Sequence, residues 1–70
     1  MDRIQVVSSN IRSVGYEADI GILEIEFTSG SIYQYFDVPE REYEELMNAA
    51  SIGKYFNRKI KDNYRYRQVQ

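Results

Sequence analysis

The sequence predicts an α+β fold, in which a three-stranded antiparallel meander is followed by two helices and by a short C-terminal strand or extended tail. Residues 23–27 alternate apolar and acidic side chains, which is typical of a half-buried strand. Gly30 separates this segment from one rich in β-branched and aromatic residues, and apolar residues at helical spacing then follow a proline. The 70 residues are expected to form a single domain, 1–70.

The first strand is expected within residues 4–17, where apolar side chains flank Ser8-Ser9-Asn10. This segment suits either one strand or a strand broken near residues 8–10. Residues 18–21 then form a turn. Residues 23–27 form the second strand, with one face buried and the other facing water. Residues 31–36 complete the meander as the partner of the second strand in a hairpin.

The length of the hairpin loop decides where two tyrosines point. In a two-residue loop, Tyr33 and Tyr35 lie on the polar face of the sheet. In a three-residue loop that ends at a left-handed Gly30, Tyr33 lies opposite Ile25 and Tyr35 opposite Leu23. We favour the longer loop, because glycine suits the positive φ and this register buries more aromatic area. Both rings are then expected mainly in the core rather than on an exposed stacking platform.

A first helix is predicted from Pro39 to about Ala50. Proline suits the first helical position, and the acidic residues that follow it complement the positive end of the helix. Tyr43, Leu46, Met47 and Ala50 fall on one stripe that can lie across the sheet. The acidic residues of this helix splay around its axis, so a solvated face is expected rather than a pair of catalytic carboxylates.

A second helix is predicted over residues 52–60, with Ser51 as its N-cap. Its apolar residues again share one face. Residues 64–69 then alternate aromatic and basic side chains, which is consistent with a short final strand or an extended tail laid on the domain.

Composition argues against the usual routes to catalysis and metal binding. With no histidine and no cysteine, the chain lacks the commonest zinc ligands, the commonest general base and a thiolate nucleophile. We therefore expect no catalytic residues, no metal site, no cofactor and no enzymatic activity. The first ten residues contain no long apolar stretch, so no signal peptide or transmembrane helix is predicted, and a cytoplasmic location without membrane contact is expected.

Charge is distributed unevenly along the chain. Residues 54–70 hold six basic side chains and one acidic side chain, so 6 minus 1 gives +5. Residues 1–53 hold three basic and ten acidic side chains, so 3 minus 10 gives −7, and the two parts sum to the net charge of −2. The molecule is therefore bipolar, and its basic end can attract phosphates or an acidic partner.

The basic end also contains aromatic residues, and the two types together form the candidate binding set. The set comprises Lys54, Arg58, Lys59, Lys61, Tyr64, Arg65, Tyr66 and Arg67. Cations bind phosphates, and unpaired bases stack on aromatic rings and on arginine planes. In the alternative interpretation, the charges solubilise the surface or pair with the acidic helix, and Tyr64 or Tyr66 closes the core.

Short motifs also occur in a fixed order along the chain. They are Gly30-Ser31-Ile32-Tyr33-Gln34-Tyr35, Val38-Pro39, Tyr43, Leu46, Ala50-Ser51, Gly53, Tyr55-Phe56-Asn57, Ile60 and Tyr64. This set spans nearly the whole chain and resembles the KTSC domain family, whose central Tyr-x-Tyr matches Tyr33-Gln34-Tyr35. That family is named after a short domain at the carboxyl end of some bacterial lysyl-tRNA synthetases, and it also occurs as small stand-alone proteins in bacteria and their phages. The resemblance implies nucleic-acid binding through the synthetase context and carries over no catalytic residues.

We therefore predict a small non-catalytic binding module, with RNA or tRNA as the ligand of the basic and aromatic residues. The alternative is a protein-interaction module. In that case the basic end docks on an acidic partner, or an exposed sheet edge pairs with another copy of the chain. The sequence leaves the oligomeric state open.

Overall fold

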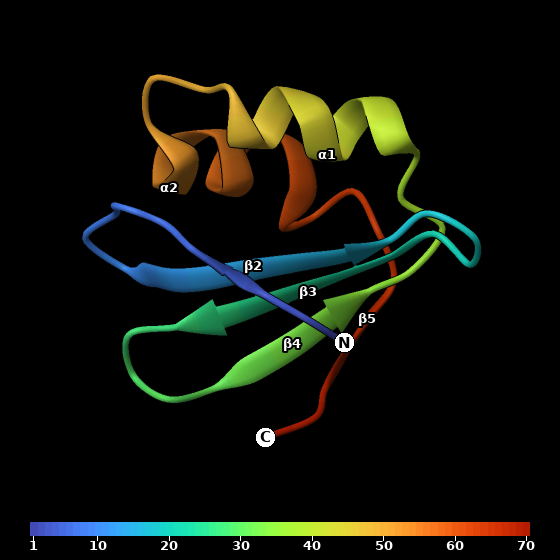
Figure 1. Cartoon of the computed structure of the whole chain (residues 1–70), viewed down its shortest axis with the longest axis horizontal. Coiled ribbons are helices and arrows are strands. Elements are labelled where there is room, and N and C mark those ends of the chain that lie inside the picture. Colours follow the sequence, from blue (N-terminus) through green and yellow to red (C-terminus); the bar gives the residue numbers. More distant parts are fainter.

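The computed structural model describes all 70 residues and contains one antiparallel sheet with helices on one face (Figure 1). Five strands follow one another across the sheet in sequence order. The elements are β1 (Ile4–Gln5), β2 (Ile11–Glu17), β3 (Ile22–Phe27), β4 (Ile32–Tyr35), α1 (Glu40–Met47), α2 (Ile52–Tyr55), the π-helical segment η1 (Phe56–Ile60) and β5 (Tyr66–Gln68). The α+β class is confirmed, and the meander of three strands is extended by one strand at each edge.

The two additional strands arise from the two segments that the sequence left open. The first segment is broken, because the Ser8 hydroxyl accepts hydrogen bonds from the backbone N–H groups of Asn10 and Ile11 and turns the chain between β1 and β2. The C-terminal segment pairs with β4, with Tyr66 opposite Tyr35. It is therefore a strand over three residues, and not a tail laid on the surface.

The predicted hairpin register is confirmed. Gly30 has a φ of 97°, and its N–H donates to the carbonyl of Phe27 at 2.9 Å. Tyr33 lies opposite Ile25 and Tyr35 opposite Leu23. Because directly paired residues share a face of a sheet, both tyrosines point toward the helices. The acidic residues of β3 consequently point the other way.

The first helix is shorter than predicted. The first begins at Glu40, with Pro39 in an extended conformation at the N-cap, and it ends at Met47 instead of near residue 50. The Asn48 amide donates to the Glu44 carbonyl at 2.8 Å, a capping bond that closes the last turn. Ala50 is exposed as a result, and it takes no part in the apolar stripe.

The second helical segment starts as predicted but widens after one turn. The Ser51 hydroxyl accepts from the Lys54 N–H at 3.2 Å, so the predicted cap is confirmed. After α2 the chain continues as η1, where the Lys61 N–H donates to the Phe56 carbonyl at 3.0 Å. Phe56 and Ile60, the first and last residues of η1, are both buried.

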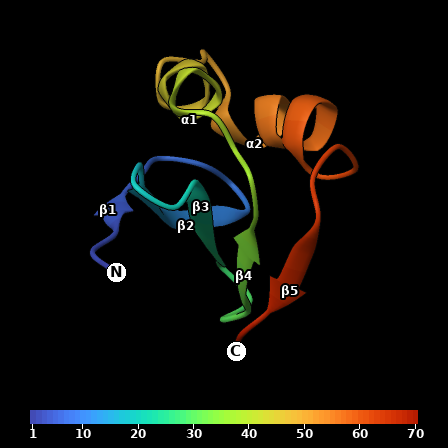
Figure 2. The same ribbon diagram turned by 90° about the vertical axis from the view of Figure 1, so that its right-hand side faces the viewer.

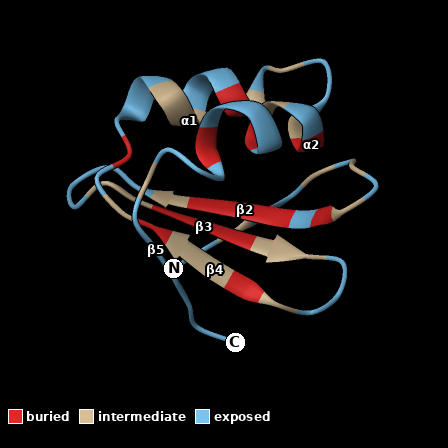
Figure 3. Cartoon of the chain, turned by 180° about the vertical axis from the view of Figure 1, so that it is seen from behind, coloured by how far each residue is buried: buried red, intermediate tan, exposed pale blue.

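The core lies between the sheet and the two helical segments on one of its faces. Figure 3 shows buried positions along β2 and β3 and on the helices. Seen along the sheet in Figure 2, α1 lies over β2 and β3, and the second helical segment lies over β4 and β5. The largest fully buried side chains are Ile11, Val14, Leu23, Ile25, Val38, Leu46 and Ile60.

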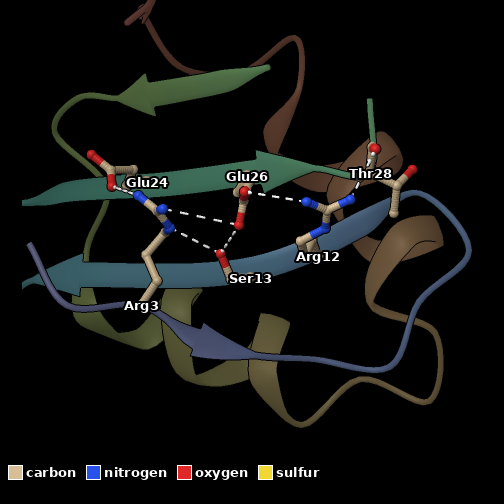
Figure 4. A network of polar contacts seen from close by, with 6 residues as sticks. All are labelled: Arg3, Arg12, Ser13, Glu24, Glu26 and Thr28. Atoms are coloured by element: carbon tan, nitrogen blue, oxygen red, sulfur yellow. Dashed lines mark hydrogen bonds and ion pairs between the residues drawn. The ribbon is translucent and has the colours of Figure 1, made fainter. Parts of the chain in front are cut away.

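The alternating pattern predicted that the face of the sheet away from the helices is open to water, but at Glu24 this face is covered. Glu24 is only 7% exposed, because the N-terminal segment crosses this face and Arg3 pairs with the Glu24 carboxylate (Figure 4). Arg3 also donates to the Ser13 hydroxyl at 2.9 Å, and the Gln34 amide donates to Glu24 at 2.8 Å. The segment lies so close to β2 that a Cβ on Gly15 would stand 2.7 Å from the backbone oxygen of Asp2.

This covered carboxylate makes stability depend on pH. Burial by itself would raise the pKa of Glu24, but hydrogen bonds from Gln34 and Arg3 outweigh it, and the pKa lies below the ordinary value of 4.5. A lowered pKa in the folded state stabilises the fold above the ordinary value, and the contribution is lost as the pH falls through the folded-state value. We expect Glu24→Gln to lower stability at pH 7 and to flatten its decline in acid.

Urea unfolding between pH 7 and pH 3 measures this difference. The exposed carboxylate Glu17 lies in no ion pair, so Glu17→Gln provides the control and should follow the unmodified protein. Identical acid sensitivity in the unmodified protein and in Glu24→Gln would contradict the assignment.

Candidate functional site

A groove of about 410 Å³ opens between β4, β5 and the end of the second helical segment. In Figure 2 these elements stand on one side of the molecule, with the turn that follows η1 joining them. Ligand pockets in proteins occupy about 300–1,000 Å³, so this groove is of a size that admits a small planar ligand. Its lining residues are Asn10, Phe27, Ser29, Ser31, Tyr33, Tyr35, Phe56, Asn57, Lys61, Asp62 and Tyr66.

Five aromatic rings form one continuous cluster along the groove. The Tyr66 ring centroid lies 5.8 Å from that of Tyr33 and 5.7 Å from that of Tyr35. Phe56 meets Tyr35 edge to face at 5.4 Å and Phe27 at 5.5 Å. We call these five rings the aromatic cluster. Tyr66 is 58% exposed, so the cluster offers a ring to solvent at its outer side.

The Tyr35 hydroxyl has no hydrogen-bond partner within the protein, although the side chain is only 4% exposed. Every fully buried polar side-chain atom of the chain has a hydrogen-bond partner. The Tyr35 hydroxyl has none, so it is not fully buried and is in contact with the groove that Tyr35 lines. Burial raises the pKa of Tyr35 to about 12, with further contributions from Tyr33, Tyr66 and Asp62. At neutral pH the hydroxyl is therefore protonated and available to donate or accept a hydrogen bond.

Four cations of the candidate set lie on or just after the second helical segment. Lys54, Arg58, Lys59 and Lys61 are all exposed, and none has a carboxylate oxygen within 4.0 Å. Lys61 also lines the groove, next to Asp62. Their charges are therefore not neutralised by ion pairs within the molecule.

The two arginines of the C-terminal strand segment lie differently. Arg65 pairs with Asp37 at 2.9 Å, and its guanidinium carbon stands 5.7 Å from the centroid of the Phe36 ring. Arg67 lies opposite Gln34, whose side chain points to the face away from the helices. The register thus places Arg67 on the opposite face from Tyr66. The structure brings Lys61 and Tyr66 together at the groove, and it sets Arg65 and Arg67 apart from them.

The acidic side chains of α1 accept hydrogen bonds from tyrosines and not from these cations. Glu42 accepts from the hydroxyl groups of Tyr55 and Tyr64, the second at 2.8 Å, and Glu45 accepts from Tyr55 at 2.9 Å. Burial and then the hydrogen bond to Glu42 raise the pKa of Tyr64 to about 12. Tyr64 therefore joins the tail to α1, and its hydroxyl is already occupied.

The groove itself was not predicted from the sequence. Of the residues that line it, the candidate binding set contained only Lys61 and Tyr66. The one signal that pointed to Asp62 is its position as a single acidic residue among six basic ones.

No three acidic, histidine or cysteine side chains gather into a group that fits a metal ion. None of the helices has the length and apolar character required to cross a bilayer.

Comparison with known proteins identifies the family to which the chain belongs. The KTSC domain model matches residues 7–64. An uncharacterized protein of Stutzerimonas stutzeri is 41% identical over 70 residues, covering 99% of both chains. A lysine–tRNA ligase of Nostoc is 48% identical over 61 residues, which is 87% of this chain but only 11% of the ligase. A KTSC domain protein of Yersinia pestis has a crystal structure that matches with a TM-score of 0.96 at 40% identity, covering 99% of this chain and 97% of that one. The chain is thus a member of the KTSC domain family.

Proposed function

We propose that this chain is a small non-catalytic module that binds RNA, with tRNA as the leading candidate, through the basic and aromatic residues near its C-terminus. The observation that carries the proposal is the group of unpaired cations beside an open aromatic groove. Cations attract the phosphate backbone, and exposed rings stack on unpaired bases. The similarity to part of a lysine–tRNA ligase supports tRNA as the class to test first.

We assign different roles to the residues of the proposed set. Lys54, Arg58 and Lys59 form the exposed phosphate-binding flank, and Lys61 and Tyr66 act at the groove. These five residues carry the main contacts. In a second group, Arg67 extends the positive surface around the edge of the sheet, Arg65 contributes less because Asp37 holds it, and Tyr64 positions the tail against α1.

A salt titration with bulk tRNA tests this division. Each phosphate contact contributes about −0.7 to −0.9 to the slope of log affinity against log salt concentration. We expect Lys61→Gln to flatten the slope by about that amount, and Arg65→Gln to flatten it less. Arg41→Gln removes the same charge from the exposed side of α1 and should leave the slope unchanged. Equal slopes for Lys61→Gln and Arg41→Gln would contradict the proposal.

A second candidate function is the docking of an acidic protein segment on the free edge of β5. β5 is the last strand of the sheet, so its outer side has no partner strand. Pairing with β5 of another copy, centred on Arg67, would set like charges opposite each other, which is unfavourable. An extended acidic segment of another protein fits this edge better. Capture of partners that survives nuclease treatment would favour this function over RNA binding.

A further inference from the structure

The groove is lined by polar residues in addition to its aromatic cluster. Asp62 and Asn57 line it, together with Tyr35, whose hydroxyl has no partner within the protein. Asp62 is close enough to contribute to the raised pKa of Tyr35. A planar ligand that lies against the rings therefore shares the groove with three polar residues, Asp62, Asn57 and Tyr35.

We infer that this groove holds a single unpaired nucleobase, with guanine as the best match. The inference rests on the proposed RNA-binding function and names the chemical class that the groove takes from the RNA. A base inside a duplex is stacked on both faces and cannot enter, so the ligand is a single strand, a loop or a bulge. Tyr66 supplies the stacking surface at the solvent side, where a base can approach from outside.

The carboxylate determines which base fits. An ionised carboxylate only accepts hydrogen bonds. Guanine presents two adjacent N–H donors, N1–H and the N2 amino group, which match the two oxygens of Asp62. Cytosine and adenine offer one amino group each. Uracil presents carbonyl oxygens on both sides of its one N–H, and these would face the carboxylate unfavourably.

Lys61 is placed to bind the phosphate that is attached to such a base in an RNA strand. Lys61 and Asp62 are neighbours in the chain and both line the groove, yet no ion pair joins them. The ammonium group is thus free for the adjacent phosphate while the carboxylate takes the base edge. An acidic side chain within a basic surface lowers the affinity of that surface for every polyanion. The presence of Asp62 is therefore consistent with a surface that selects among bases.

Fluorescence anisotropy with two labelled RNA heptanucleotides, UUUGUUU and UUUUUUU, tests the inference at one fixed salt concentration. We expect the guanine-containing strand to bind about tenfold more tightly, since one good pair of hydrogen bonds to a base gives discrimination of that order. Asp62→Asn should reduce the preference to about threefold or less, because the amide keeps one acceptor and loses the second. Asp19→Asn changes the net charge equally in an exposed turn and should preserve the preference.

A structural readout separates the inference from the proposed function. On titration with UUUGUUU, backbone amide shifts in the NMR spectrum should move at Asn57, Asp62 and Tyr66. A preference for guanine that depends on Asp62 supports the inference. Equal binding of both strands, with shifts confined to the flank of Lys54, Arg58 and Lys59, would overturn the inference and leave RNA binding in place. Absence of binding to either strand and to bulk tRNA would overturn both.

Discussion

Replacing Phe56 with alanine is expected to lower the free energy of unfolding by about 3–5 kcal/mol, the largest effect of any single substitution proposed for this protein. Phe56 is 2% exposed, and it packs edge to face against both Phe27 and Tyr35. Its removal loses the transfer free energy of the ring and leaves a cavity between the second helical segment and the sheet. The free energy of unfolding of a domain of this size lies at the lower end of about 5–15 kcal/mol. The variant should therefore be largely unfolded near 37 °C.

Urea unfolding followed by circular dichroism measures this loss. Phe36→Ala is the matched control, because Phe36 lies outside the aromatic cluster and is only half-buried. Phe56→Leu keeps most of the volume and provides a folded variant for comparison, with an expected loss of about 1–1.5 kcal/mol. A loss for Phe56→Ala no larger than that for Phe36→Ala would contradict the role assigned to Phe56 in joining η1 to the sheet.

Local sequence patterns were sufficient to predict the elements that depend on residues close together in the chain. Gly30 is the clearest case, because the three-residue loop combines its positive φ with a register that buries more aromatic area, and that choice set the register of Tyr33 and Tyr35. The Ser51 cap was predictable for the same reason, since a capping bond spans three residues. The ends of the helices were predicted less well. α1 ends at Met47, at a turn closed by Asn48, which the apolar spacing alone does not reveal.

Features that depend on distant segments could not be read from local patterns. The burial of Glu24 requires Arg3, twenty-one residues earlier in the chain, to reach across the sheet. The groove requires residues from the β1–β2 loop, the hairpin, η1 and β5 to meet in space. The sequence indicated a basic and aromatic end with six cations. How those cations divide between two faces follows only from the pairing of β5 with β4.

Removing four unpaired cations is expected to weaken binding of bulk tRNA by about 10²–10³-fold at low salt, since each lost phosphate contact also loses the release of its counterions. The variant carries glutamine in place of Arg58, Lys59, Lys61 and Arg67. None of these side chains is buried and none is in an ion pair, so the fold should be retained. Its net charge falls from −2 by 4 to −6.

A charge-balanced version of this variant separates local charge from net charge. It also neutralises four exposed carboxylates outside the C-terminal segment, which restores the net charge from −6 by 4 to −2. The added changes are Glu17→Gln, Asp19→Asn, Glu40→Gln and Glu44→Gln. If the positions of the cations matter, this variant should bind tRNA as weakly as the four-site variant.

The affinity of the charge-balanced variant for bulk tRNA, measured at about 50 mM salt beside the unmodified protein, is the most direct test of the proposed binding surface. The proposal predicts that the two proteins, equal in net charge, differ by at least about a hundredfold in affinity. Equal affinities would show that the cations near the C-terminus form no binding surface for a polyanion, and would contradict the proposal.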